Sequence, residues 1–195
     1  MPMPKQLDRK RLILKFLVTA SAAALLTAAV AMPASAELAH AQLKDTGGKA
    51  VGDVDLMQTP AGVLIKLRLS GLTPGEHAFH VHEIGKCDPP FTSAGGHFNP
   101  EHHKHGIIAG PGHAGDMPNL HVPQSGDLSV EVVNAAITLE KGKPNSLFDS
   151  DGSAIVIHAK ADDYKSDPAG NAGDRIACGV IEQSGATVGN SPPKK

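Results

Sequence analysis

Val63-Leu64-Ile65-Lys66-Leu67-Arg68-Leu69 is the stretch of this sequence that decides the fold. Every odd-numbered residue in it is aliphatic, whereas the even-numbered residues include Lys66 and Arg68. Successive side chains of a β-strand point to opposite faces, so this alternation predicts a strand with one buried face. The turn residues Ser70-Gly71 follow and end the strand.

Other short apolar runs surround this stretch and are separated by Gly, Pro, Asn and Asp. They cover residues 78–83, 128–133, 135–139, 154–158 and 176–181. Thr46-Gly47-Gly48 and Pro60-Ala61-Gly62 predict hairpin turns between the first strands. No segment of the sequence shows a sustained 3.6-residue period. The pattern therefore predicts an all-β fold, an antiparallel sandwich or barrel.

The first 36 residues have the pattern of a secretory signal peptide. Basic residues precede an apolar run over residues 16–31, and Ala34-Ser35-Ala36 is a small-residue cleavage site. The alternative, a membrane anchor, would need roughly 20 apolar residues. We expect a cleaved signal peptide at residues 1–36, a single mature domain at 37–195, and no stable membrane anchor after cleavage. The protein is then periplasmic or secreted.

The charge of the chain limits its partners. Formal net charge is −2 at pH 7, and cleavage would remove five basic residues and one acidic residue, which leaves −6. A nucleic-acid-binding domain normally carries a basic excess, so no nucleic-acid partner is expected. Exported proteins fold in oxidising compartments, where the two cysteines, Cys87 and Cys178, either pair or remain as buried thiols.

Histidine is abundant, with 11 in the chain, and several histidines are spaced as metal ligands are. His80 and His82 are two apart on a predicted strand, so both imidazoles leave the same face. The segment 83–127 is rich in Gly and Pro, and a loop of this length needs something to hold it. Within it lie His97, His105, His113 and Asp116. His158 ends a separate apolar run. Together these residues predict a metal site.

The chain resembles the bacterial secreted copper/zinc superoxide dismutases. Segments in the family's order carry the resemblance: Phe79-His80-Val81-His82, Gly95-Gly96-His97-Phe98-Asn99-Pro100, His113-Ala114-Gly115-Asp116 and Arg175-Ile176-Ala177-Cys178-Gly179. The resemblance implies an antiparallel Greek-key β-sandwich or barrel with long metal-binding and active-site loops.

The resemblance also implies two metal ions, copper and zinc, as cofactors. The implied copper ligands are His80, His82, His97 and His158. The implied zinc ligands are His97, His105, His113 and Asp116, so that His97 would bridge the two ions. Cys87 and Cys178 would form the family's disulfide, and Arg175 would be the catalytic cation beside the copper. Asp162, favoured by spacing over Asp163, would accept hydrogen bonds from His80 and His105.

The implied activity is the disproportionation of superoxide to dioxygen and hydrogen peroxide, by alternate reduction and reoxidation of copper. His97 would leave the copper and carry a proton, and Arg175 would dock the anion. Because a mature charge of −6 repels superoxide, local positive charge must attract it. Asp174, next to Arg175, would partly neutralise that residue. A homodimer is one of the oligomeric states that the resemblance allows.

Three other classes of protein compete with this interpretation. A metal carrier or copper chaperone on the same sandwich would lack a ligand or Arg175, and here neither is missing. A zinc hydrolase would need a general base beside three ligands. An adhesion-type sandwich would not need histidines placed in this way. The histidines without an implied role are expected at the surface: His40, His77, His102, His103 and His121.

Overall fold

The alternating stretch that begins at Val63 forms a strand, as predicted. In β3 (Gly62–Leu69) the side chains of Val63, Ile65 and Leu67 are fully buried, whereas Arg68 is exposed. The structure is a computed structural model that describes residues 37–108 and 110–184. The predicted signal peptide at residues 1–36 lies outside the described residues.

Strands make up most of the regular structure. They are β1 (Leu38–Asp45), β2 (Ala50–Thr59), β3, β4 (Gly75–His77), β5 (Phe79–His82), β6 (Leu120–Val122), β7 (Leu128–Asn134), β8 (Ala154–His158), β9 (Arg175–Val180) and β10 (Glu182–Gln183). A short 3-10 helix, η1 (Thr92–Ala94), lies between β5 and β6. Within residues 37–108 and 110–184, no helical segment has the length and hydropathy of a transmembrane span.

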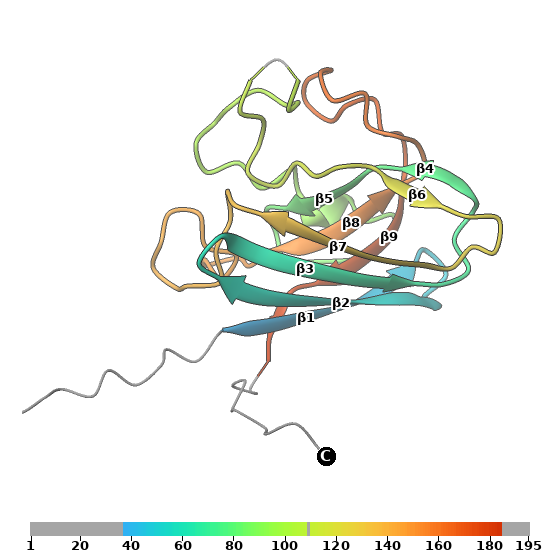
Figure 1. The fold of residues 1–195 in the computed structure, drawn as a ribbon, viewed down its shortest axis with the longest axis horizontal. Coiled ribbons are helices and arrows are strands. Elements are labelled where there is room, and N and C mark those ends of the chain that lie inside the picture. The colour runs from blue at the N-terminus through green and yellow to red at the C-terminus, as the bar shows by residue number, and fades with distance from the viewer. Residues whose placement is uncertain (1–36, 109, 185–195) are drawn as a thin grey trace, which may run out of the picture. The chain divides into compact units, whose positions relative to one another are not determined.

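The main sheet is antiparallel and has the strand order β5-β8-β9-β1-β2-β3-β7, with β10 paired to β1. β4 and β6 form a separate two-stranded ribbon. The chain crosses from β3 to β5 at the other end of this order, returns to β7, and crosses again to β8 (Figure 1). These crossovers are those of a Greek key, so the predicted fold class is confirmed.

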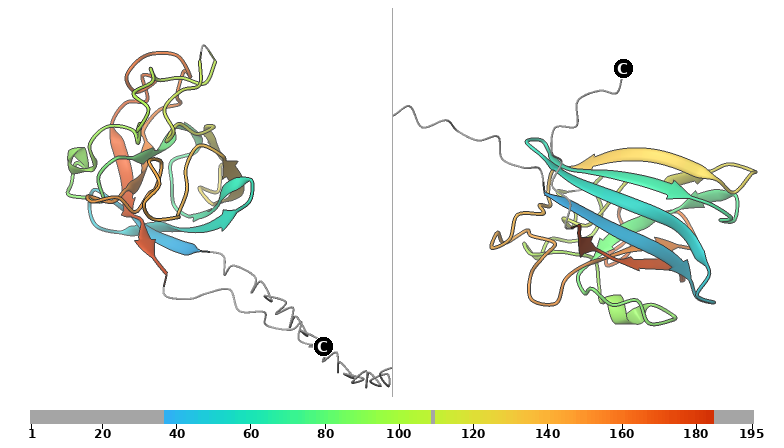
Figure 2. Two further views of the ribbon diagram at one scale, coloured as in Figure 1. Left: turned by 90° about the vertical axis from the view of Figure 1, so that its left-hand side faces the viewer. Right: turned by 90° about the horizontal axis from the view of Figure 1, so that it is seen from below.

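The sheet curls so that its two halves face each other, as the two views in Figure 2 show. Leu43, Val54 and Ile65 from β1, β2 and β3 share one buried cluster with Phe79 and Ile155 from β5 and β8. Apolar residues on alternate positions of these strands therefore fill a single core, and the polar positions face outward.

One predicted strand is wrong. Residues 135–139 are irregular, although Ile137 and Leu139 are buried. The side chain of Gln58 accepts hydrogen bonds of 2.8 Å from the Thr138 hydroxyl and from the Leu139 amide. The segment is apolar because it packs on the core, and a short apolar run does not by itself identify a strand.

Two long loops lie beyond the end of β5. Figure 1 shows the segment that precedes β6 and the segment between β8 and β9 side by side. Gly170 brings the second loop against Asp162, because its φ is +61° and a Cβ there would collide with the Asp162 carboxylate. A disulfide joins Cys87 to Cys178 in β9, with a Cα–Cα distance of 5.6 Å, so the two cysteines pair.

Candidate metal centre

β5 presents two imidazoles on the side of the strand that faces the loops. Phe79 and Val81 point into the core cluster, and His80 and His82 alternate with them. All four residues are fully buried. The apolar residues thus anchor the strand, and the anchored strand fixes the histidines.

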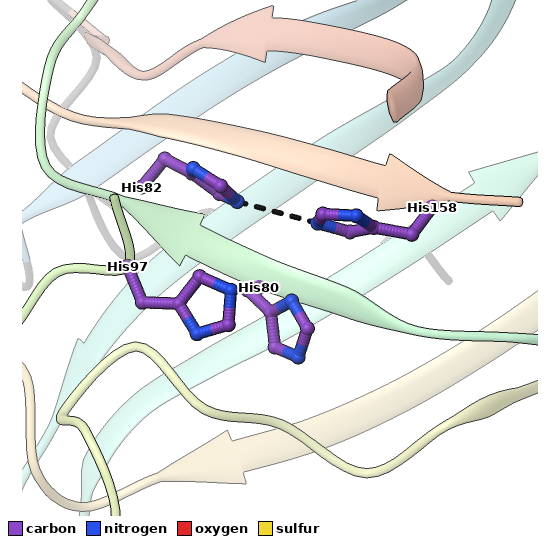
Figure 3. Close-up of side chains that lie close together, drawn as sticks. All are labelled: His80, His82, His97 and His158. Atoms are coloured by element: carbon purple, nitrogen blue, oxygen red, sulfur yellow. Dashed lines mark hydrogen bonds between the residues drawn. The ribbon is translucent and has the colours of Figure 1, made fainter. Parts of the chain in front are cut away.

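His97 and His158 complete a group of four histidines with His80 and His82 (Figure 3). His158 ends β8, the strand next to β5, and His97 lies in an isolated β-bridge opposite His82. The Nε2 atoms of His82 and His158 lie 3.4 Å apart, and the rings of His80 and His97 have centroids 3.9 Å apart. One nitrogen from each ring lies within 4.8 Å of the others, so the group can surround one ion.

A second buried group forms around the Asp116 carboxylate and shares His97 with the first. Asp116 Oδ1 lies 2.8 Å from His97 Nδ1, 3.0 Å from His105 Nδ1 and 3.5 Å from His113 Nδ1. The other oxygen, Oδ2, accepts hydrogen bonds from the backbone N–H groups of Gly106 and His113. Three imidazoles and one carboxylate at this spacing match a four-coordinate zinc site.

Unpaired nitrogens show that metal ions fit these groups. The Nδ1 atoms of His80 and His113 and the Nε2 atom of His97 are buried, and none has a hydrogen-bond partner among the described residues. Burial lowers the pKa of His80 to about 4 and that of His158 to about 3, and it lowers the pKa of His82 as well. These imidazoles are therefore neutral at pH 7, the form that binds metal.

Asp162 connects the two groups. It accepts hydrogen bonds of 2.8 Å from His80 Nε2 and 3.0 Å from His105 Nε2, one on each carboxylate oxygen. Although burial opposes the change, these hydrogen bonds lower the pKa of Asp162 to about 2. Asp163, the alternative, instead accepts hydrogen bonds from Ser166 and from the Asn171 side chain.

Arg175 lies beside the group of four histidines. Its guanidinium donates hydrogen bonds of 2.7 Å to the carbonyl oxygen of Phe91 and 2.6 Å to that of Gly95. The Gly95 carbonyl also accepts a hydrogen bond of 3.1 Å from His82 Nδ1. Among the described residues no ion pair joins Arg175 to Asp174.

A cavity of about 510 Å³ opens over the site, and Arg175, His97 and His158 line it. His80 and His82 lie beneath and are fully buried. A small anion that enters this cavity meets the guanidinium and the two histidines that line it. The arrangement can therefore hold an anion against a metal ion.

His77 is buried, so the prediction that it lies at the surface is wrong. His77 is 4% exposed, and its Nδ1 and Nε2 lie 2.8 Å from the carbonyl oxygens of His158 and Thr73. Histidine is only partly buried on average, but His77 is buried because the polar atoms of its ring have partners inside the protein.

Asn119 and Tyr164 also support the site, although the sequence pattern predicts no role for either residue. The Asn119 side chain accepts a hydrogen bond of 2.8 Å from the Asp162 amide and donates one of 2.9 Å to the Asp162 carbonyl. The Tyr164 amide donates a hydrogen bond of 2.6 Å to Asp162 Oδ1, and the Tyr164 hydroxyl accepts one from the Asn119 amide. The contacts of Asn119 span 43 and 45 positions, so no local pattern predicts them, whereas the contact between Tyr164 and Asp162 spans two.

Seven side chains thus form two ligand groups that share one imidazole on a Greek-key β fold, which defines a class of dinuclear metalloprotein. The family model for copper/zinc superoxide dismutase matches residues 50–181. The chain belongs to the copper/zinc superoxide dismutase family. It is accordingly an enzyme that acts on superoxide, with copper and zinc as its cofactors.

Relatives cover most of the chain. This chain is 58% identical over 146 residues to superoxide dismutase [Cu-Zn] 1 of Aquifex aeolicus. The aligned region covers 73% of this chain and 86% of that protein. The fold is similar to that of the Cu/Zn superoxide dismutase from Brucella abortus, with a TM-score of 0.64 at 33% identity, over 75% of this chain and 100% of that one. A SOD-like protein from Bacillus subtilis has a TM-score of 0.69 at 42% identity, over 72% and 96% of the two chains.

Proposed function

We propose that copper is held by His80, His82, His97 and His158, that zinc is held by His97, His105, His113 and Asp116, and that His97 bridges the two ions. The observation that carries this proposal is the position of His97 in both groups. Its Nδ1 faces Asp116, and its buried Nε2 has no hydrogen-bond partner among the described residues. Two cations can together remove both ring protons of one imidazole.

The ligand sets differ in a way that separates the metals. Four imidazoles suit copper, whereas three imidazoles with a carboxylate suit zinc in a tetrahedral arrangement. Ligand type and geometry must select the metals, because raw affinity would place copper in both groups. Asp162 would hold the rings of His80 and His105 in the required tautomer through its two hydrogen bonds.

When bound, copper supplies a one-electron couple, so that two superoxide ions and two protons become dioxygen and hydrogen peroxide. The protein's own residues bind the anion and move protons. Arg175 docks superoxide in the cavity through its fixed positive charge. His97 carries a proton on Nε2 and gives it to the departing peroxide, and solvent in the cavity supplies the second proton.

We also propose that residues 1–36 are a cleaved signal peptide, that residues 37–195 form the mature domain, and that the enzyme is periplasmic or secreted. The disulfide between Cys87 and Cys178 supports an oxidising compartment. The enzyme would remove superoxide outside the cytoplasm, without a stable membrane anchor. Sedimentation of the purified protein distinguishes a homodimer from a monomer.

Metal analysis combined with a superoxide-decay assay tests the proposed function. We expect one copper and one zinc per chain. His158→Ala should lose copper and activity. His97→Ala should lose activity and the imidazole that joins the two metal sites. His121→Ala is the matched control, because this histidine is exposed on β6 and pairs only with Glu76. Full activity in a copper-free sample would contradict the proposal.

A further inference from the structure

Two histidines outside both ligand groups line the same cavity as the metal centre. His102 and His103 share the cavity of about 510 Å³ with His97 and His158. His102 is exposed and the His103 side chain is 37% exposed, whereas His97 and His158 are buried. The first pair therefore lies in the outer part of the cavity and the second pair in its inner part.

The chain fixes this pair in place. Asn99 clamps the backbone of His103: its Oδ1 accepts a hydrogen bond of 3.0 Å from the His103 amide, and its Nδ2 donates one of 2.8 Å to the His103 carbonyl. The Asn99 carbonyl accepts a hydrogen bond of 3.2 Å from the His102 amide. His102 has a φ of 55°, a left-handed conformation that is uncommon outside glycine. The turn is thus held by its own hydrogen bonds.

The chemistry of the pair suits a copper ion. Glu101 Oε2 lies 3.4 Å from His103 Nε2, so a carboxylate accompanies the imidazoles and offsets the neighbouring charge of Lys104. Within the part of the chain that the structure describes, the His102 ring makes no hydrogen bond or ion pair with another residue. Imidazole is a preferred copper ligand, and copper binds such sites more tightly than the other divalent first-row metals do.

The lining of the cavity carries charges of both signs. Arg175 is positive, whereas the carboxylates of Glu83 and Asp167 line the same cavity and offset that charge for an approaching copper ion. An ion that is first bound at the outer histidines reaches the inner ones by ligand exchange, without crossing the cavity as a free hydrated ion. All four histidines line one cavity, so the exchange takes place within it.

We propose that His102 and His103 form a capture site that binds copper first and passes it inward to His97 and His158. The transfer is an exchange of ligands at constant oxidation state, so no electron donor is required. This proposal rests on the proposed copper assignment and adds the path by which the ion arrives.

Copper uptake by zinc-loaded, copper-free protein tests the capture site. Copper(II) in a weak chelator complex is mixed with the protein, and the visible absorption of copper in its final site is followed in time. The double variant His102→Asn, His103→Gln removes both ligands, and asparagine tolerates the left-handed backbone at residue 102. We expect the uptake rate to fall by about tenfold or more, as for other losses of a residue that supports a metal site. The final copper content and spectrum should match those of the wild type.

Equilibrium binding gives an independent readout. Fully loaded wild-type protein should bind one additional, weaker copper(II) ion with its own electron paramagnetic resonance signal, and the double variant should not. His121→Gln, which removes an exposed histidine elsewhere, should change neither readout.

The outcomes separate the capture site from the copper assignment. An unchanged uptake rate in a double variant that loads normally would overturn the capture site alone. A variant with an altered final spectrum or a lower copper content would also overturn it, because the two histidines would then shape the final site. A wild-type protein that takes up no copper would overturn the copper assignment and the capture site together.

Discussion

Asp162 and His80 form a buried hydrogen bond in which His80 Nε2 donates to Asp162 Oδ2 over 2.8 Å. The other carboxylate oxygen accepts from His105 Nε2 over 3.0 Å. His80 belongs to one ligand group and His105 to the other, so a single carboxylate orients a ring in each. His97 and Asp162 therefore both join the two groups.

Replacing Asp162 should weaken both metal sites. We expect Asp162→Asn to lower the affinity for copper and for zinc by about 10- to 100-fold, because the amide no longer accepts both ring N–H groups. Competition against chelators of known affinity measures this. Asp163→Asn is the matched control, since that carboxylate bonds only to its own loop. Equal metal affinities in the Asp162 variant and the wild type would refute the orienting role.

The stability of the metal-free protein should depend on pH between 7 and 5. Burial lowers the pKa of His80 to about 4 and that of His158 to about 3, whereas histidine in an unfolded chain titrates near 6.5. As pH falls below 6.5 the unfolded state binds protons that the folded state does not, so stability present above pH 6.5 is lost. We expect the free energy of unfolding at pH 5 to be lower by on the order of 2 kcal/mol per histidine than at pH 7.

Urea unfolding at the two pH values measures this loss. Carboxylates do not complicate the comparison, because their unfolded-state pKa values lie near 4. The free energy of unfolding of His158→Gln should fall less between pH 7 and pH 5 than that of the wild type, by the contribution of the His158 ring. Identical unfolding curves at pH 7 and pH 5 would show that the rings are already protonated or solvated in the folded state.

Docking by Arg175 should make the reaction sensitive to salt. We expect kcat/KM for superoxide to fall as ionic strength rises from about 10 mM to about 150 mM, because counter-ions screen the local positive charge. Arg175→Gln should lower kcat/KM by about tenfold or more and flatten the salt dependence. Arg68→Gln serves as control, since Arg68 pairs with Asp55 on the outer face of β3. A rate that rises with salt would exclude attraction at the site.

The disulfide should stabilise the fold and support Arg175. Removing it with Cys87→Ser and Cys178→Ser should lower the free energy of unfolding by about 2 to 5 kcal/mol, because it closes a loop of 91 positions. Phe91 and Cys178 share a small buried cluster, and the Phe91 carbonyl binds the Arg175 guanidinium. Catalysis should therefore fall by more than the loss of folded protein explains. Normal activity per folded molecule would show that Arg175 keeps its position without the disulfide.

The sequence predicted the structural features that depend on local residue patterns. Alternation identified β3 and β5, and the Cys87–Cys178 pair followed from the family resemblance and is confirmed. The run at residues 135–139 misled because core contacts, and not a partner strand, explain its apolar residues. The support that Asn119 gives to Asp162 joins residues 43 positions apart through tertiary hydrogen bonds, and no periodicity predicts such contacts.

His77 provides the last prediction, because it connects the fold to the metal centre. Its ring bridges the carbonyl oxygens of His158 and Thr73 at 2.8 Å each, and the residue is buried. A neutral imidazole donates through one of its two nitrogens, so replacing His77 with Phe keeps an aromatic ring but removes the donor to one of these carbonyls. We expect His77→Phe to lower the free energy of unfolding by about 1 to 3 kcal/mol, the cost of an unsatisfied buried acceptor.

The effect of His77→Phe on metals should be selective. His158 is in the copper group only, so copper should dissociate faster while zinc affinity stays within error of the wild type. Urea unfolding and chelator competition measure the two effects, and His121→Phe controls for adding an aromatic ring. Equal losses of copper and zinc would mean that the variant loosens the whole sheet, whereas a loss confined to copper would show that His77 holds His158 in place through its carbonyl.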